Sequence, residues 1–211
     1  MHRSRSIPST ALFKKFCRGV HSNRFDAACE IKRIGNINSQ GATHWKAVLT
    51  DIYSINGVPC GGYVTAIAVT AAKSALTTAE RSMFDDCLSV TGPFHAATEH
   101  LKDADIYTEV LHVGRSNASV AVRVSQDGLI RCSFMVLLGN LSKMSGINVG
   151  EGVHGAPELP PMDQCLDASA IIKKAFGSGF RIADELELRV VREQLFATRI
   201  SEYAQVVSSI C

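Results

Sequence analysis

The sequence predicts an α+β protein in which an antiparallel sheet wraps around one central helix. Three observations lead to this prediction: a long uncharged segment, several strand patterns that follow it, and one strong hairpin signal. A run of strands beside a single helix, without regular alternation of the two, is typical of α+β proteins.

The uncharged segment lies between Asp51 and Lys73, and the helix is predicted over residues 61–76. Alanines are frequent in it, with five of them from Ala66 to Ala75. A helix that is apolar on every side has to be surrounded by other elements rather than lie on a surface. Because alanine side chains are small, they allow a surrounding sheet to approach closely. This segment is therefore predicted to be the centre of the fold.

Strands are predicted both before and after this helix in the sequence. Before it, Trp45, Ala47 and Leu49 recur with a period of two, after a polar loop over residues 35–41. The strands predicted after it are 87–98, with a bend at Gly92-Pro93, and then 104–113, 118–126 and 129–138. Asp127-Gly128 is predicted to join the last two strands as a two-residue hairpin.

Composition and charge limit the class of protein. The chain has 211 residues, of which 46% are hydrophobic, and this is enough for a sizeable core. The formal net charge of +2 is too small to indicate a nucleic-acid partner, and no apolar run is long enough for a membrane helix. The seven cysteines form no CxxC pair and no short cluster with histidine. We therefore expect no disulfide framework, no metal site and an intracellular protein.

The two ends of the chain are predicted to lie outside the main domain. Residues 1–25 are basic, and this composition predicts a basic tail or, alternatively, a mitochondrial transit peptide. We expect a cytoplasmic protein, with a mitochondrial location as the alternative. Residues 141–167 are rich in glycine and proline and are predicted to be a linker. Beyond the linker we expect a short helix over 168–176, a strand over 181–192, and a strand or helix over 195–210.

Two motifs indicate a family. The first is Gly57-Val58-Pro59-Cys60-Gly61-Gly62-Tyr63-Val64, at the predicted helix start. The second is Val110-Leu111-His112-Val113-Gly114-Arg115-Ser116, which Val122-Arg123-Val124-Ser125-Gln126-Asp127-Gly128 follows. In this order and spacing the motifs resemble thioesterase-like superfamily proteins, which are double-hotdog relatives of the thioesterase II type of acyl-CoA thioesterase. The resemblance covers residues 45–140.

The resemblance implies a hotdog fold over residues 26–140, in which an antiparallel sheet wraps around a central helix. It also implies a partial second hotdog over residues 168–211, because no second apolar helix with a Gly-Gly start follows the linker. In thioesterase II enzymes the acidic and polar catalytic residues lie in the second hotdog. The resemblance therefore supplies no matching catalytic residue of that kind here.

The function that the resemblance implies is hydrolysis of an acyl-CoA or acyl-carrier-protein thioester by water, in lipid metabolism and without a cofactor. The backbone N–H groups of Gly61 and Gly62, at the positive end of the helix dipole, are the candidate oxyanion hole. The alternative is that these glycines only permit tight packing of the helix on the sheet. Asp51 is the candidate general base, and its alternative is a solvated carboxylate at a strand end.

Substrate contacts are expected at two places. Cys60 and Tyr63 flank the glycine pair, and Cys60 has a second interpretation as a nucleophile at the helix start, although the sequence fixes no histidine partner for it. The resemblance places Gly114, Arg115 and Ser116 near the binding site of CoA or phosphopantetheine. Arg115 would pair with a phosphate there, or else lie in solvent as an ordinary turn arginine.

A second candidate function is a non-catalytic hotdog protein that binds an acyl chain or a partner hotdog. The absence of Asp and Glu from the predicted helix favours it. A hydratase is disfavoured, because no Asp/His pair in a hydratase-like pattern is present. Since a single complete hotdog would leave an open sheet edge, we expect a homodimer or a larger assembly. The other expected partner is the acyl-CoA or acyl-carrier-protein substrate, with no nucleic acid and no membrane.

Overall fold

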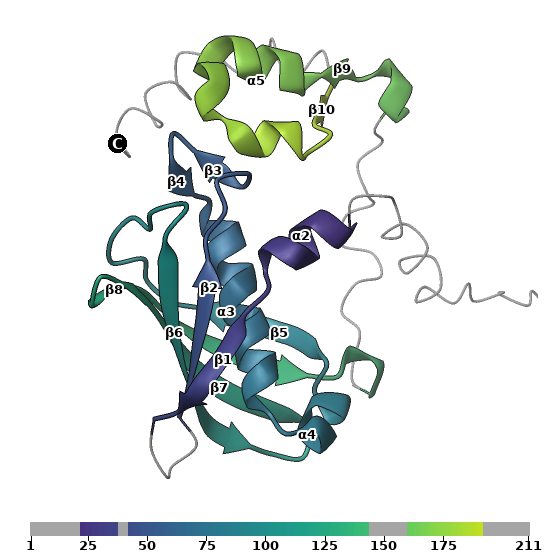
Figure 1. The fold of residues 1–211 in the computed structure, drawn as a ribbon. Helices are drawn as coiled ribbons and strands as arrows, with labels where there is room; N and C mark the ends of the chain where they lie inside the picture. The colour runs from purple at the N-terminus through teal and green to yellow at the C-terminus, as the bar shows by residue number, and fades with distance from the viewer. Residues whose placement is uncertain (1–21, 38–41, 144–159, 192–211) are drawn as a thin grey trace, which may run out of the picture.

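The computed structural model describes residues 22–37, 42–143 and 160–191, and its main body is an antiparallel sheet with a helix across it (Figure 1). The sheet has six strands in the order β1-β2-β6-β7-β8-β5. Every neighbouring pair in it is antiparallel. The strands are β1 (Lys32–Asn36), β2 (Thr43–Val48), β5 (Asp86–Thr91), β6 (Asp103–Val113), β7 (Asn117–Gln126) and β8 (Leu129–Gly139).

The helix is α3 (Gly61–Ala75), and it lies at the centre of the hydrophobic core. Ala68, Ala71 and Ala72 are each 0% exposed. The helix packs against β2, β5, β6, β7 and β8. The prediction of a central helix over residues 61–76, wrapped by an antiparallel sheet, is therefore confirmed.

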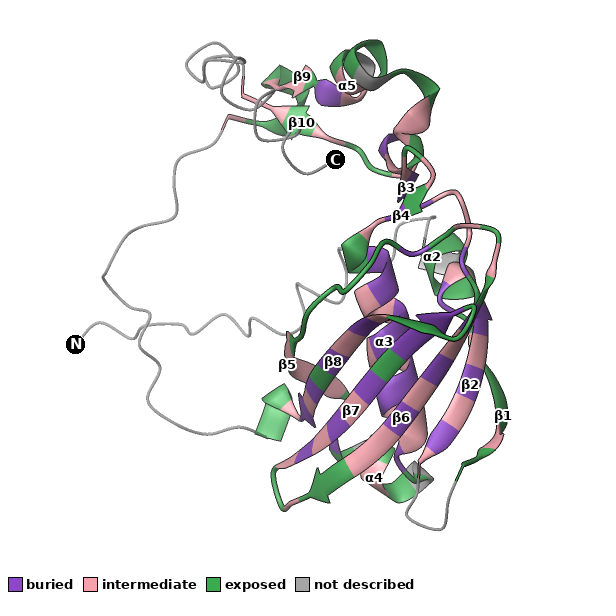
Figure 2. Cartoon of the chain, turned by 90° about the vertical axis from the view of Figure 1, so that its left-hand side faces the viewer, coloured by how far each residue is buried: buried purple, intermediate pink, exposed green. Residues whose placement is uncertain are grey.

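The sheet has one face packed on α3 and one face turned away from it, which we call the outer face. In β7, Val120, Val122 and Val124 are at most 1% exposed and belong to the core. Ala121 and Arg123 between them belong to the outer face and are not buried. Figure 2 shows the same alternation along the neighbouring strands. Antiparallel sheets commonly have one such solvated face, and the predicted period of two is confirmed.

The hairpin between β7 and β8 is as predicted, but the strand that follows α3 is shorter than predicted. Asp127 and Gly128 have φ angles of 53° and 77°, as a two-residue hairpin turn requires. β5 ends at Thr91 instead of residue 98. At Gly92 the chain comes so close to β8 that a Cβ atom would lie 1.9 Å from the carbonyl oxygen of Ser133. The predicted bend is therefore the place where the strand stops.

Two elements before the helix were not predicted from the sequence. β1 occupies part of the segment predicted as a polar loop, and nearly all of its residues are exposed. An exposed edge strand shows no alternation of apolar residues, so the sequence pattern did not reveal it. α2 (Ser22–Ala28) begins inside the predicted tail 1–25, whose first 21 residues lie outside the described residues. By contrast, the strand predicted around Trp45 is β2, and the Trp45 indole N–H donates to Thr108 Oγ1 in the core (2.9 Å).

Short elements connect the main ones. A hairpin of β3 (Ser54–Ile55) and β4 (Val58–Pro59) leads into α3, and α4 (Thr78–Met83) follows it. A short 3₁₀ helix, η1 (Leu141–Lys143), follows β8. None of the helices in the described ranges has the length and apolarity needed to cross a membrane.

Residues 160–191, which we call the C-terminal unit, contain only short elements. These are η2 (Met162–Gln164), β9 (Leu166–Asp167), α5 (Ala168–Phe176), η3 (Gly177–Gly179), η4 (Arg181–Asp184) and β10 (Arg189–Val190). The predicted helix over 168–176 is confirmed as α5. The predicted strand over 181–192 is wrong. Its first residues form η4, which buries Ala183, and only the two residues of β10 pair with β9. A partial second hotdog is not confirmed, and residues 144–159 and 195–210 lie outside the described residues.

The C-terminal unit contacts α2 and the loop that leads into α3. Arg181 Nη1 lies 3.2 Å from Asp51 Oδ2. The N–H of Asn56 donates to the carbonyl oxygen of Gly179 (2.7 Å). On α2, an arginine pairs with Glu185, whose side chain is only 9% exposed. These contacts join parts of the chain that are distant in sequence.

Replacing Ala71 with leucine should destabilise the protein, because a fully buried alanine has no room for a larger side chain. We expect the free energy of unfolding to fall by about 1–3 kcal/mol, the usual cost of overpacking a core. The same change at Ala79, an exposed position of α4, is the matched control. Urea unfolding of both variants measures the difference. Equal losses would show that α3 is not packed as described.

Candidate active site

The N-terminal tip of α3 is exposed and has no side-chain cap. Gly61 and Gly62 are both exposed, and the N-cap residue, Cys60, makes no side-chain hydrogen bond to the helix. The first N–H groups of a helix have no acceptor inside it. In the described chain, no other group accepts a hydrogen bond from the amides of the two glycines. α4 and α5 differ, because Thr77 and Asp167 cap them. Two unused donors therefore lie at the tip of α3.

The space around the two glycines differs. A Cβ atom on Gly61 would lie 3.2 Å from the Phe94 ring, whereas a Cβ atom on Gly62 would meet nothing within 4 Å. Phe94 packs edge-on against Phe134, with ring centroids 5.3 Å apart, and is itself 51% exposed. Tight packing therefore accounts for a glycine at position 61. It does not account for Gly62, where the space is open to a ligand.

Tyr63, a predicted substrate contact, lies in the core. It is 2% exposed, and its hydroxyl donates to the carbonyl oxygen of Ala28 (2.8 Å) and accepts from the N–H of Thr50 (3.2 Å). Burial raises the pKa of the Tyr63 phenol, so the group stays neutral. Both hydrogen-bonding functions of the hydroxyl are thus used inside the protein. They tie α2 and the end of β2 to the first turn of α3.

Cys60 is half-buried and directly precedes the glycine pair. Burial raises the pKa of its thiol, which leaves less thiolate at neutral pH than free cysteine has. The histidine hydrogen bonds of the described chain go to Asp105 and Ser133 instead of this sulfur. The interpretation of Cys60 as a nucleophile therefore gains no support from its surroundings.

Asp51, the candidate base, is engaged away from the tip. Its carboxylate is paired with Arg181, and in the described chain no hydrogen bond or ion pair connects it to Gly61 or Gly62. The Thr65 hydroxyl in the first turns of α3 only donates to the carbonyl oxygen of Gly61 (2.8 Å), a common arrangement in helices. The same described ranges contain no group of three or more His, Cys, Asp or Glu placed to hold a metal ion. The tip thus presents backbone hydrogen-bond donors, and the carboxylate of Asp51 is not bonded to them.

The turn Gly114-Arg115-Ser116 lies at the other end of the sheet. Phe94, which touches Gly61, pairs with Cys132 near the start of β8. Asn117, directly after the turn, pairs with Gly139 at the end of β8. Strand residues advance by about 3.3 Å each, so the two places are about 20 Å apart. Within one copy the structure therefore does not bring the turn to the glycine pair.

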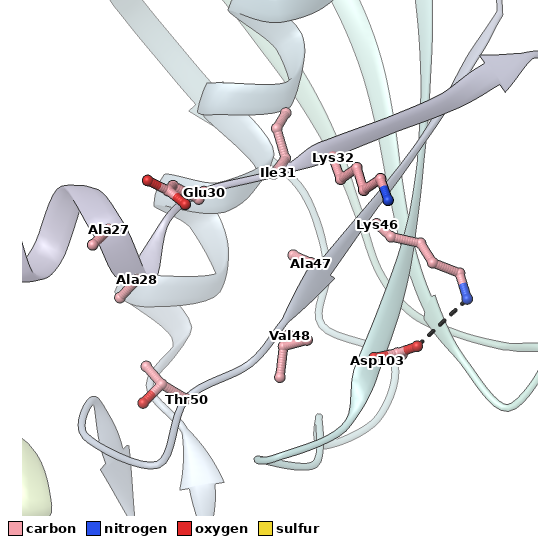
Figure 3. Close-up of a pocket in the computed structure, with 10 residues that line it drawn as sticks. All are labelled: Ala27, Ala28, Glu30, Ile31, Lys32, Lys46, Ala47, Val48, Thr50 and Asp103. Atoms are coloured by element: carbon pink, nitrogen blue, oxygen red, sulfur yellow. Dashed lines mark hydrogen bonds and ion pairs between the residues drawn. The ribbon is translucent and has the colours of Figure 1, made fainter.

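A groove of about 460 Å³ opens between α2, β1 and β2 (Figure 3). Two of its lining residues, Ala28 and Thr50, are the ones that hydrogen-bond to the Tyr63 hydroxyl. On its β2 side, Lys46 Nζ lies 3.5 Å from Asp103 Oδ2, as the dashed line shows. The groove could not be predicted from the sequence, because α2 and β1, which form one side of it, were not predicted.

A sheet of this topology wrapped around one helix, with a free helix tip, defines a hotdog domain. Residues 49–139 match the family model of the acyl-CoA thioesterase N-terminal domain. This segment, which contains α3 and the strands β5 to β8, is therefore similar to that domain, in agreement with the resemblance that the two motifs indicated. No curated protein matches the chain.

Three solved structures illustrate the likeness. A protein described as a thioesterase II, from Thermobifida fusca, is 23% identical with a TM-score of 0.52, over 68% of this chain and 48% of that one. A hypothetical thioesterase protein from Streptococcus pneumoniae, solved with coenzyme A, is 17% identical with a TM-score of 0.44, over 52% and 87%. Zebra fish thioesterase superfamily member 2 is 14% identical with a TM-score of 0.48, over 64% and 99%. The chain thus spans about half the length of the Thermobifida fusca protein.

The raised pKa of Cys60 predicts slow alkylation at moderate pH. Because only the thiolate reacts, the rate at pH 8 should fall below that of free cysteine and should keep rising above the pH at which free cysteine levels off. Iodoacetamide labelling of the folded protein from pH 7 to 10, followed by peptide mass spectrometry, measures this. A labelling rate at pH 7 that exceeds that of free cysteine would instead support an activated thiolate.

Proposed function

We propose that this protein hydrolyses an acyl-CoA or acyl-carrier-protein thioester and that the tip of α3 is its oxyanion hole. The observation that supports this most directly is the pair of unused amide donors on Gly61 and Gly62, in a domain of the acyl-CoA thioesterase type. The positive end of the helix dipole lies at the same place and favours a developing negative charge.

In the proposed reaction, a water molecule attacks the carbonyl carbon of the thioester, and negative charge collects on the carbonyl oxygen. The amides of Gly61 and Gly62 would hold that oxygen, and each donor of this kind contributes about 10²–10³-fold in rate. The carbon–sulfur bond then breaks, and the proton lost by the water reaches the thiolate. The products are the free acid and the thiol of the carrier. The open space at Gly62 leaves room for the reacting carbonyl.

We further propose that a second copy completes this site, because Asp51, the candidate base, is paired with Arg181 away from the tip. β5 is an edge strand of the sheet, and exposed edges pair readily. It begins at Asp86, beside the end of β8 where the Arg115 turn lies, and it ends at Thr91, three residues before Phe94, which contacts Gly61. Antiparallel pairing of two β5 strands about a two-fold axis would therefore bring the turn of one copy to the helix tip of the other.

In such a dimer, Arg115 of one copy would bind a phosphate of the carrier while the glycine pair of the other copy holds the carbonyl. Arg115 is exposed, and a guanidinium binds phosphate oxygens in a bidentate manner. CoA and phosphopantetheine are long molecules, so their phosphate and thioester lie far apart. The proposed pairing thus gives both predicted substrate regions a role in one site.

A non-catalytic acyl-binding protein is the second candidate, and one observation favours it. The carboxylate of Asp51 is bound by Arg181, so the tip of a single copy has no carboxylate of its own. Such a protein would hold an acyl-CoA without releasing CoA.

The wild-type protein is expected to release free CoA from at least one acyl-CoA in a panel of chain lengths, detected with a thiol reagent. Gly62→Ala should lower kcat by about tenfold or more, because its methyl group would occupy the space proposed for the reacting carbonyl. Gly35→Ala, which also has open space but lies on β1, should leave turnover unchanged. Measurable acyl-CoA binding without any release of CoA would contradict hydrolysis and support the second candidate.

Arg115→Gln should raise KM for acyl-CoA by about tenfold with little change in kcat, because a phosphate contact far from the carbonyl is made equally in the ground and transition states. Arg81→Gln, at an exposed arginine of α4, is the matched control. Sizing chromatography should give the mass of a dimer or a larger assembly. A monomer that turns over acyl-CoA normally would rule out a site shared between copies.

A further inference from the structure

A row of polar side chains crosses the outer face of the sheet. Cross-strand pairing places Tyr107 between His44 and Arg123. It also places Ser133 beside Arg123. His95 extends the row, because its Nε2 lies 3.1 Å from Ser133 Oγ. Residues directly opposite on antiparallel strands have Cβ atoms about 4.5–5.5 Å apart, so these side chains are neighbours.

Next to this row the outer face is hollowed. The neighbouring row has Ala121 between Glu109 and Met135. Because alanine is small, the space above it stays open. A hollow of about 360 Å³ results, with Pro93, Ala121 and Met135 on its apolar side and Arg123 on its polar side. Most of its lining is apolar.

Arg123 lies between this hollow and a second one of about 300 Å³ beside Tyr107. Its side chain is 55% exposed, and Nη2 is 3.8 Å from Glu109 Oε2, beyond hydrogen-bond distance. A guanidinium has five N–H donors, and those of Arg123 make no hydrogen bond within the described chain. Carboxylate and phosphate oxygens are the groups that such a side chain binds best. The hollow therefore has an unused cationic donor at its edge.

We propose that this part of the outer face binds a small organic acid, with its anionic head on Arg123 and its apolar arm over Ala121 and Met135. The apolar lining suits a short alkyl or aryl arm better than an inorganic ion. The Ser133 hydroxyl, next to Arg123 across the strands, can be a second donor for the head when it accepts its hydrogen bond from the Nε2–H of His95. The site is on the opposite face of the sheet from α3, so it does not depend on thioester hydrolysis at the helix tip.

Of the acidic residues near the hollow, Glu109 is the one that would compete with a bound acid for Arg123. Asp105, on the same face, is already engaged by His44 Nε2 at 2.8 Å and lies 4.0 Å from Lys46 Nζ. Glu109 is closer to Arg123 and holds it only through a long ion pair. Removing the charge of Glu109 should therefore strengthen the binding of an acid, whereas removing the charge of Arg123 should weaken it.

The test is a titration of the full chain with hexanoate, followed by NMR chemical shifts of the backbone amides. Shifts are expected at residues 121–123 and 133–135, with a dissociation constant on the order of millimolar, as suits one charged contact and little apolar area. Arg123→Gln should weaken binding about tenfold. Glu109→Gln should strengthen it about two- to fivefold. Arg81→Gln should leave it unchanged, and thermal melting confirms that each variant is folded.

Two further ligands separate the head from the arm. Hexanol lacks the charge and inorganic phosphate lacks the arm, and each is expected to bind about tenfold more weakly than hexanoate. Equal binding of either one, or equal binding of hexanoate by the Arg123→Gln protein, would overturn the proposal. Shifts confined to Gly61 and Gly62 would place the acid at the helix tip and would also overturn it.

Discussion

The burial of an uncharged, alanine-rich helix against the sheet is the interaction on which the rest of the structure depends. Alanines such as Ala68 and Ala71 contribute little buried area themselves, but their size lets the strands come close. Larger side chains of the sheet, such as Phe134, can then reach the helix, and burial of a side chain of that size stabilises the fold by about 1.5–3 kcal/mol. The packing also fixes the strand register, since a shift by one residue would turn the apolar set of a strand outward.

This packing decides where a ligand can meet the helix. One face of α3 is buried against the strands and its opposite side is only partly covered, whereas its N-terminal tip is exposed. Its C-terminal end is followed directly by α4, whose own first turn is closed by a capping box. Its N-terminal end emerges beside Phe94 with Gly61 and Gly62 uncapped. The same burial that stabilises the domain thus leaves two oriented amides at one exposed position.

The parts of the fold that follow from a local period could be predicted from the sequence. The helix over 61–76 and the strands that became β6, β7 and β8 carry clear patterns, and Asp127-Gly128 fixes one turn. β1 and η4 could not be predicted, because an exposed edge strand and a short 3₁₀ turn have no such pattern. At the site, the glycine pair was found from a motif. The engagement of Asp51 by Arg181, and the row through Arg123, depend on contacts between distant segments that only the structure shows.

The attachment of the C-terminal unit has a consequence for how the chain would respond to cleavage. Its contacts with the main body include two ion pairs, one backbone hydrogen bond, a bridge between Ile55 and Phe180, and packing of Ile182 against the core. A separate peptide of this length would have to be held by these contacts alone. Because the C-terminal unit belongs to the same chain as the hotdog, this connection makes their association intramolecular, with an effective concentration on the order of millimolar. A protease that cut this connection would remove that advantage. The loop before α3, and with it Asp51, would then lose its neighbour without any change in the hotdog itself.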